Sequence, residues 1–303
     1  MVGPHTRKSM INITDLRGLV LKSTKIEEAV EFYENLWGLK NIDSWQGDSA
    51  FFEATGDEGF ILGLVPDNQR GIETIRFALG SPEDVDTSFA ELRASGQKLL
   101  DEPDRLPIPG EYYGFHLQDL DGTKIELSAT SKTKKNNGED PFAPQRLSHL
   151  VVNSPDNVAL KDFYINCLGL KLADWYKGDL FFFLRCNQQH HVLGVERSDN
   201  SSLNHVAFHV EDLDAMMRRI GAMANTGHKP IWGPGRHGPG GNCFCYFEGP
   251  DGFVLELTSE LIEVADDEEW TPKEWIPGPE SANVWGTGGR TEQAIKLMSG
   301  RED

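Results

Sequence analysis

Two histidines and one glutamate, each inside an apolar segment, are the side chains of this 303-residue sequence best suited to hold a metal ion. His149 and His205 each begin a β-prone segment, and Glu256 interrupts a third. Burying an ionised carboxylate in such a strand costs several kcal/mol unless a cation compensates. Two imidazoles and one carboxylate from three strands form the facial triad that binds Fe(II). The alternative is that these are ordinary core or surface side chains.

The segment around Glu256 predicts a hairpin. Residues 248–252 have the sequence EGPDG, which combines the residues of tight turns, and β-prone stretches flank them. In a hairpin centred on Asp251, Tyr246 lies opposite Glu256, with the two side chains on one face roughly 5 Å apart. We therefore expect Tyr246 beside the candidate metal ligand.

A neighbouring histidine, His209, is predicted not to bind the same ion. His205 and His209 have the spacing of zinc ligands on a helix. The segment HVAFHV is rich in β-branched and aromatic residues, however, and this composition predicts a strand. Four residues of a strand span roughly 13 Å, which is too far for one ion.

An internal repeat indicates which elements position these residues. The segment EFYENLWGLK at 31–40 returns as DFYINCLGLK at 162–171, 131 positions later. The segment DGTKIEL at 121–127 returns as DGFVLEL at 251–257, 130 positions later. Two copies of one unit therefore stand in tandem.

The repeat predicts two domains, at residues 1–130 and 146–260, with a polar linker at 131–145 and a C-terminal arm at 261–303. Each domain shows twice the pattern of a strand, a helix and three short strands. We predict an α+β fold of four βαβββ modules, in which paired sheets enclose a concave cavity. The arm is expected to run over the domain surface, with its last dozen residues disordered.

The two copies differ at the candidate ligands. The aligned pairs are Gly18 with His149, Ile75 (roughly) with His205, Phe60 with His191, and Glu126 with Glu256. Seven of the nine histidines lie in the second copy, and a shared fold does not require them there. The C-terminal domain is therefore predicted to be the working one.

Composition excludes several classes of partner. The net charge of −19 argues against nucleic acid and against an anionic membrane surface, because both attract basic proteins. The sequence shows neither an apolar run of about 18 residues nor a secretory signal. A cytoplasmic protein is expected.

Five strings of the second copy resemble the catalytic domain of type I extradiol ring-cleaving dioxygenases, of the vicinal oxygen chelate superfamily. They are SHLVV around His149, FLRCNQQHHVLGV around His191, LNHVAFHVEDLD around His205, GPGRHG around His237, and YFEGPDGFVLEL from Tyr246 to Glu256. The most specific part is the spacing of His237, Tyr246 and Glu256, nine and then ten residues. The resemblance covers nearly the whole chain, because the family shares the tandem-domain plan.

The resemblance implies an enzyme that opens the ring of an aromatic diol with O₂, and it implies a homo-oligomer. The implied roles are His149, His205 and Glu256 as ligands of Fe(II), with Mn(II) as the alternative metal; His191 as acid and base; His237 and Tyr246 as hydrogen-bonding partners of the substrate; and Phe183 and Trp232 in the pocket. His190 is expected to be structural. Family members that act on carboxylated catechols carry an Arg at the position of Trp232, so an aromatic or alkyl-substituted catechol is expected.

Two rival functions remain at this point. The first is another metal-dependent enzyme of the superfamily, either a glyoxalase-like isomerase or lyase or a hydroquinone-cleaving dioxygenase. Glyoxalase-type sites usually place a glutamate where His149 or His205 stands and do not need His191. The second rival is a protein that binds an aromatic compound, in which Glu256 would be a costly buried charge.

Overall fold

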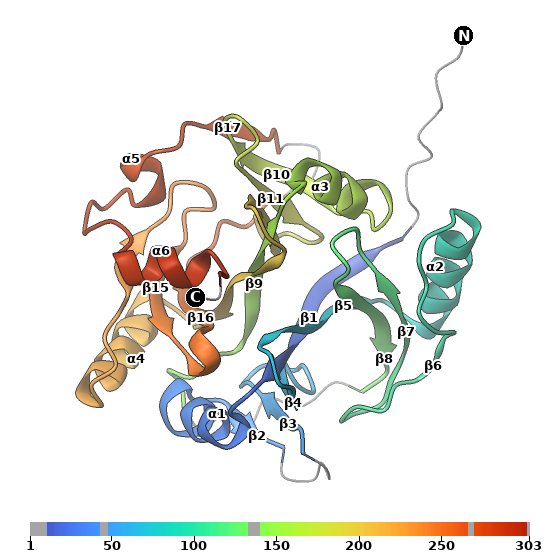
Figure 1. The fold of residues 1–303 in the computed structure, drawn as a ribbon, viewed down its shortest axis with the longest axis horizontal. Coiled ribbons are helices and arrows are strands. Elements are labelled where there is room, and N and C mark those ends of the chain that lie inside the picture. Colours follow the sequence, from blue (N-terminus) through green and yellow to red (C-terminus); the bar gives the residue numbers. More distant parts are fainter. Residues whose placement is uncertain (1–10, 43–47, 133–139, 266–269, 302–303) are drawn as a thin grey trace.

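The computed structural model describes residues 11–42, 48–132, 140–265 and 270–301, and two β-sheets dominate it (Figure 1). Eight strands form the first sheet, in the order β2-β3-β4-β1-β5-β8-β7-β6. Nine strands form the second, in the order β14-β15-β16-β13-β9-β12-β11-β10-β17. Residues 133–139 of the predicted linker lie outside the described residues.

The first half of the chain supplies the eight-stranded sheet and its helices. These elements are β1 (Ile13–Ser23), α1 (Ile26–Phe32), the π-helical turn η1 (Tyr33–Trp37), β2 (Lys40–Asn41), β3 (Ala50–Glu53), β4 (Leu62–Pro66), β5 (Gly71–Leu79), α2 (Pro82–Ala94), β6 (Asp104–Arg105), β7 (Tyr112–Gln118) and β8 (Lys124–Thr130).

The second half supplies the nine-stranded sheet and the C-terminal elements. These are β9 (Arg146–Ser154), α3 (Asn157–Asn166), β10 (Lys171–Tyr176), β11 (Phe181–Arg185), β12 (Leu193–Arg197), β13 (Ser202–His209), α4 (Leu213–Asn225), β14 (Trp232–Arg236), β15 (Cys243–Glu248), the 3₁₀ turn η2 (Pro250–Gly252), β16 (Val254–Ser259), β17 (Lys273–Trp275), α5 (Pro279–Ala282) and α6 (Glu292–Met298).

Each half consists of two βαβββ modules joined through their first strands. In the first half β1 pairs antiparallel with β5, and each of them pairs in parallel with the last strand of its own module, β4 or β8. The second half repeats this pattern with β9 and β13 at its centre. The predicted α+β fold of four modules is therefore confirmed.

The helices begin where the sequence supplies capping side chains. Ser81, Asp156 and Asp212 each accept a backbone N–H at the start of α2, α3 and α4, and such caps stabilise a helix by about 1 kcal/mol. Helix α1 continues as η1 and ends at Gly38, whose φ of 84° suits glycine.

One hydrophobic core runs through both halves. Trp37 of the first half contacts the rings of Phe208 and Phe247 of the second. In the reverse direction, Tyr164 of α3 lies beside Phe77 of β5 and donates its hydroxyl to Asp119 Oδ2 at 3.1 Å. The two halves therefore exchange aromatic side chains, and neither buries its core alone.

The C-terminal arm ends in a helix, so the expectation of disorder is wrong for residues 292–301; residues 302 and 303 lie outside the described residues. Strand β17 pairs in parallel with β10 at the sheet edge, and helix α6 follows over the second half (Figure 1). Thr291 caps α6, and Ala294 and Met298 are buried in a cluster with Trp232 and Tyr246. Burial of this apolar stripe fixes a helix that is too short to be stable alone.

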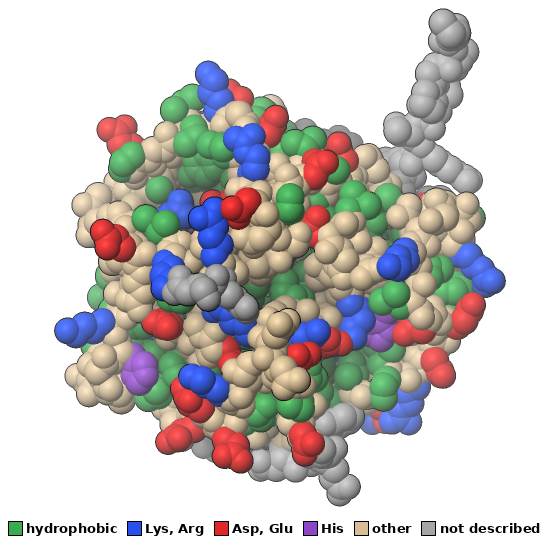
Figure 2. Space-filling view, in the orientation of Figure 1, with side chains coloured by type: hydrophobic (Ala, Val, Ile, Leu, Met, Phe, Trp, Pro, Cys, Tyr) green, Lys and Arg blue, Asp and Glu red, His purple; other side chains and the backbone are tan. Residues whose placement is uncertain are grey.

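No helix among the described residues has the length and apolar character needed to cross a membrane. On the face drawn in Figure 2, acidic and basic side chains are interspersed.

Candidate metal centre

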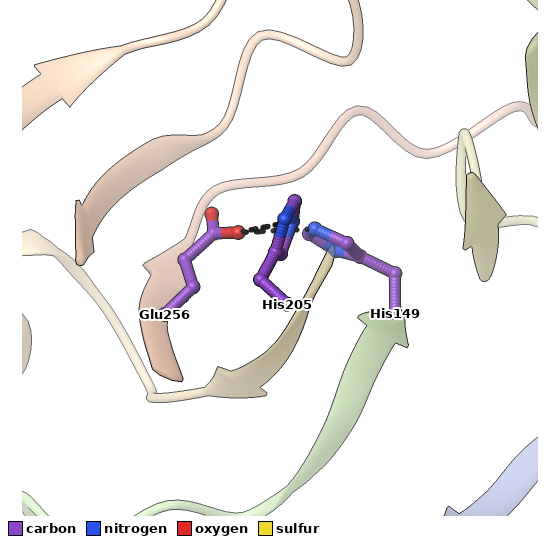
Figure 3. A group of neighbouring side chains, drawn as sticks. All are labelled: His149, His205 and Glu256. Carbon is purple, nitrogen blue, oxygen red and sulfur yellow. Dashed lines mark hydrogen bonds and ion pairs between the residues drawn. The ribbon is translucent and has the colours of Figure 1, made fainter. Parts of the chain in front are cut away.

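The structure brings His149, His205 and Glu256 together from three adjacent strands, β9, β13 and β16 (Figure 3). His149 Nε2 lies 3.1 Å and His205 Nε2 lies 3.3 Å from the same oxygen, Glu256 Oε2. All three side chains are buried. His209 also lies on β13, as predicted, and it is not part of this group.

Hydrogen bonds behind the cluster decide which nitrogen of His205 faces the glutamate. Asn204 donates its amide to Glu196 Oε2 and to Asn153 Oδ1, at 2.7 and 3.0 Å, so its own Oδ1 can only accept. His205 Nδ1 lies 2.8 Å from that oxygen and must donate to it. A neutral His205 therefore presents the lone pair of Nε2 towards Glu256.

This arrangement fits a cation. A lone pair facing a carboxylate oxygen is repulsive, and a divalent ion bound by both atoms removes the repulsion. Burial raises the pKa of Glu256, but the charge and hydrogen bonds of His149 and His205, when these are protonated, outweigh burial and hold it well below the ordinary carboxyl value, so a positive charge at this place keeps Glu256 ionised. Ionised Glu256 and two neutral imidazoles are the ligand forms that a metal requires. Asn242 donates to the other oxygen, Oε1, at 3.2 Å and orients the carboxylate.

His191 lies beside this cluster, just before β12. Its ring centroid is 4.3 Å from that of His149 and 5.1 Å from that of Phe183. Burial, together with the neighbouring histidines, lowers the pKa of His191 well below its ordinary value. In the metal-free protein His191 is therefore neutral at pH 7 and can accept a proton.

His237 and Tyr246 form a pair on the other side of the cluster. His237 Nδ1 donates to the carbonyl of Ala282 at 2.7 Å, so its Nε2 accepts the Tyr246 hydroxyl at 3.0 Å. Tyr246 pairs with Glu256 across β15 and β16, so the predicted hairpin is confirmed. Burial and the charge of Glu256 raise the pKa of Tyr246 well above its ordinary value, and burial lowers that of His237 to about 4.

A cavity of about 630 Å³ opens onto these residues. Its lining includes seven of the eight predicted site residues, all except Glu256: His149, Phe183, His191, His205, Trp232, His237 and Tyr246. The C-terminal arm supplies much of the remaining wall, from Pro277 to Met298. Sequence reasoning missed this contribution, because no local pattern indicates where the arm docks.

The cavity also has a charged end. Glu196 and Arg290 line it, and the guanidinium of Arg290 lies 5.6 Å from the centre of the Trp232 ring. Burial raises the pKa of Glu196, against the effect of Arg290. The arm therefore places one positive charge beside Trp232 in the cavity wall.

The first half contains an ion pair in the equivalent place. Glu126, the counterpart of Glu256, accepts from Arg76 Nε at 2.9 Å, and both side chains are buried. A Cβ atom at Gly18, the counterpart of His149, would lie 3.3 Å from Arg76 Nη1, so glycine leaves room for the guanidinium. An arginine thus provides the cation that Glu126 needs.

The alignment of Ile75 with His205 is wrong by one residue. His205 pairs with Val151 in the second sheet, and in the first sheet the equivalent pair is Thr74 with Val20. The register shift beside this position is the same in both sheets, and the offset between the halves is still 131 here. The first half has its one extra residue only later, between α2 and β7. The place of such an extra residue is not visible in a hydrophobic pattern.

Comparison with known proteins supports the same family. Residues 19–127 and 146–257 match the model of the Glyoxalase/Bleomycin resistance protein/Dioxygenase superfamily. A manganese-dependent 2,3-dihydroxybiphenyl 1,2-dioxygenase of Geobacillus genomosp. 3 is 25% identical over 85% of this chain and 88% of its own length. Metapyrocatechase 2 of Cupriavidus necator is 26% identical over 65% of this chain and 66% of its own length.

A solved structure is similar over almost the whole chain. The Mn(II)-bound glyoxalase from Novosphingobium aromaticivorans has a TM-score of 0.87 and 35% sequence identity, covering 93% of this chain and 94% of that one. The resemblance inferred from the five sequence strings is thereby confirmed. With two family matches on two sheets of the expected modules, this chain belongs to the Glyoxalase/Bleomycin resistance protein/Dioxygenase superfamily.

Proposed function

We propose that this protein is a metal-dependent extradiol dioxygenase, which opens the ring of an aromatic diol with O₂. The observation that carries the proposal is the convergence, at one cavity, of the His149, His205 and Glu256 cluster with the neutral His191 and the His237–Tyr246 pair. Relatives named as dioxygenases support it.

We assign the metal to His149, His205 and Glu256. A divalent ion held there supplies Lewis acidity towards a diol and redox chemistry towards O₂. Fe(II) and Mn(II) both suit two imidazoles and one carboxylate, and the named manganese dependence of one relative makes Mn(II) a full alternative.

The other side chains act on the substrate and its protons. His191 is neutral and accepts a proton from the bound diol, which it later returns. Tyr246 is a protonated phenol that donates to His237 in this structure, and it transfers this hydrogen bond to a substrate oxygen when the diol binds. Phe183 and Trp232 give the cavity apolar walls that exclude water.

We also propose domain boundaries at residues 1–130 and 146–260, with the arm at 261–303. Two separate sheets and two separate family matches support them. A homo-oligomer and a cytoplasmic location remain predictions from the sequence.

The test is reconstitution of metal-free protein. Fe(II) or Mn(II) is added without oxygen, followed by catechol, 2,3-dihydroxybiphenyl or a carboxylated catechol, and then air. We expect a yellow ring-opened product, with one O₂ consumed for each diol. Glu256→Ala, treated in the same way, should give no colour. Wild-type protein that binds one metal and leaves every diol intact would contradict the proposal.

A second function is favoured by one observation, the 35% identity to a protein described as a glyoxalase. A glyoxalase-like isomerase would convert the adduct of methylglyoxal and glutathione without consuming O₂. Turnover of that adduct under nitrogen, with no diol cleavage in air, would select this function instead.

A further inference from the structure

His190 and Asp174 form a buried pair, and the ring of His190 also contacts His191. His190 Nδ1 lies 3.0 Å from His191 Nδ1, and His190 Nε2 lies 3.1 Å from Asp174 Oδ2. All three side chains are buried, with exposed fractions of 0 to 3%. We propose that Asp174 and His190 are positioning residues that fix the tautomer and the ring orientation of His191. The catalytic meaning of this proposal rests on the proposed function, whereas the structural claim does not.

The carboxylate decides where His190 carries its proton. The N–H direction of His190 Nε2 is not aligned with Asp174 Oδ2 as a hydrogen bond requires, so the contact is mainly electrostatic. A carboxylate at 3.1 Å still strongly favours an N–H over a lone pair on the facing nitrogen. A neutral His190 therefore carries hydrogen on Nε2 and a lone pair on Nδ1.

The tautomer of His190 in turn determines the tautomer of His191. Two Nδ1 atoms 3.0 Å apart share one hydrogen, and His190 Nδ1 has a lone pair, so the hydrogen belongs to His191. His191 Nε2 is then left with its lone pair, which is the form that accepts a proton from a substrate. The dyad selects a tautomer and does not need any group to change its charge.

The C-terminal arm holds the dyad in place. Asp174 Oδ2 also accepts Trp275 Nε1 at 2.6 Å, and Oδ1 accepts the backbone N–H of Lys273 at 2.8 Å. Trp270 stands edge-on to His190, with ring centroids 5.2 Å apart. The carboxylate of Asp174 cannot turn away without breaking its contacts with β17, and the ring of His190 cannot turn away without leaving Trp270.

The first half has neither histidine at the equivalent positions. There Phe60 replaces His191, and Gly59 replaces His190. The counterpart of Asp174 is Asp43, which lies outside the described residues. The two histidines are therefore replaced together in the half whose described residues contain no group of candidate metal ligands.

The first test reads the tautomer directly. In metal-free protein labelled with ¹⁵N-histidine, long-range ¹H–¹⁵N correlation spectra distinguish Nδ1–H from Nε2–H rings, and His191→Phe assigns the signal. We expect Nδ1–H for His191 in the wild type and in His190→Asn, because the Asn side-chain oxygen can replace the Nδ1 lone pair. We expect loss of that preference in His190→Phe. An Nε2–H ring in the wild type, or an unchanged ring in His190→Phe, overturns the proposal.

The second test uses the metal-loaded enzyme. His190→Phe should lower kcat by about 10- to 100-fold, with KM and metal content nearly unchanged, as is common when a partner behind an active group is removed. His190→Asn should recover most of the loss. The control is His209→Phe, the same change at a half-buried position of β13, which should keep full turnover. A lower melting temperature with unchanged kcat would reduce His190 to a packing role. Because the tautomer is read without metal or turnover, absence of diol cleavage would not decide this question.

Discussion

Arg76 donates from Nε to Glu126 Oε2 at 2.9 Å, in the first half of the chain, where the part that the structure describes contains no candidate metal cluster. The guanidinium also lies 3.9 Å from the centre of the Phe60 ring, the counterpart of His191. One arginine therefore contacts the equivalents of both a proposed metal ligand, Glu256, and the proposed proton acceptor, His191. The first half provides a cation for its buried glutamate from its own side chains, and we propose that a metal ion does so in the second half.

The first prediction concerns this ion pair. Arg76→Met should lower the free energy of unfolding by about 3–5 kcal/mol, because it leaves Glu126 buried and unpaired. The double change Arg76→Met with Glu126→Leu should recover most of the loss. Urea unfolding measures both, and metal content serves as the control because the cluster lies in the other half. A single variant as stable as the wild type would show that water reaches Glu126.

The second prediction separates metal ligands from other histidines. His205→Ala should lose the bound metal, whereas His209→Ala, four residues later on the same strand, should retain it. Elemental analysis after dialysis reads the difference. Equal metal content in the two variants would remove His205 from the site.

The third prediction concerns His191. His191→Phe copies the Phe60 of the first half, so the ring should be accommodated and the metal retained. Turnover should fall by about 10²- to 10⁴-fold, the usual contribution of a general acid and base. Steady-state kinetics with metal analysis tests this, and unchanged kcat would exclude His191 from proton transfer.

The fourth prediction is a pH dependence of stability at the contact between the two halves. Burial raises the pKa of Asp119 to about 6, although Thr123 and Tyr164 donate to it. The folded state therefore favours the protonated acid. Its contribution to stability is present below about pH 4 and is lost as the pH rises through 6, by roughly 3 kcal/mol in total.

Asp119→Asn should flatten this part of the profile. The difference in unfolding free energy between variant and wild type, measured from pH 4 to pH 8 in metal-free protein, should shift towards the variant as the pH rises. A constant difference would place the pKa of Asp119 at its ordinary value.

The repeat and the turn chemistry allowed most of the fold to be predicted. The offset near 131 residues aligned four modules, and the EGPDG turn placed Tyr246 opposite Glu256 because hairpin register is set by its turn. The repeat predicts Ile75 as the counterpart of His205, whereas the structure gives Thr74. This difference shows the limit of aligning the two halves by sequence. The first half has one extra residue between α2 and β7, and the apolar pattern does not show whether the offset changes from 131 to 130 before or after β5.

The supporting residues could not be predicted for a different reason. Asp174 and Arg290 act through partners that are far away in the sequence, so no spacing marks them. Asn204 is adjacent to His205 and resembles any polar strand residue until Glu196 is seen beside it. Asp174 becomes recognisable only when the arm places Trp275 against it.

The arm also sets the order in which the site can be completed during synthesis. The cavity walls that come from Pro277 to Met298 leave the ribosome after all three candidate metal ligands. On every nascent chain, the candidate ligand cluster is therefore complete before the residues that cover the cavity have been synthesised. A chain released early, without this segment, would expose the cluster to the surrounding solution.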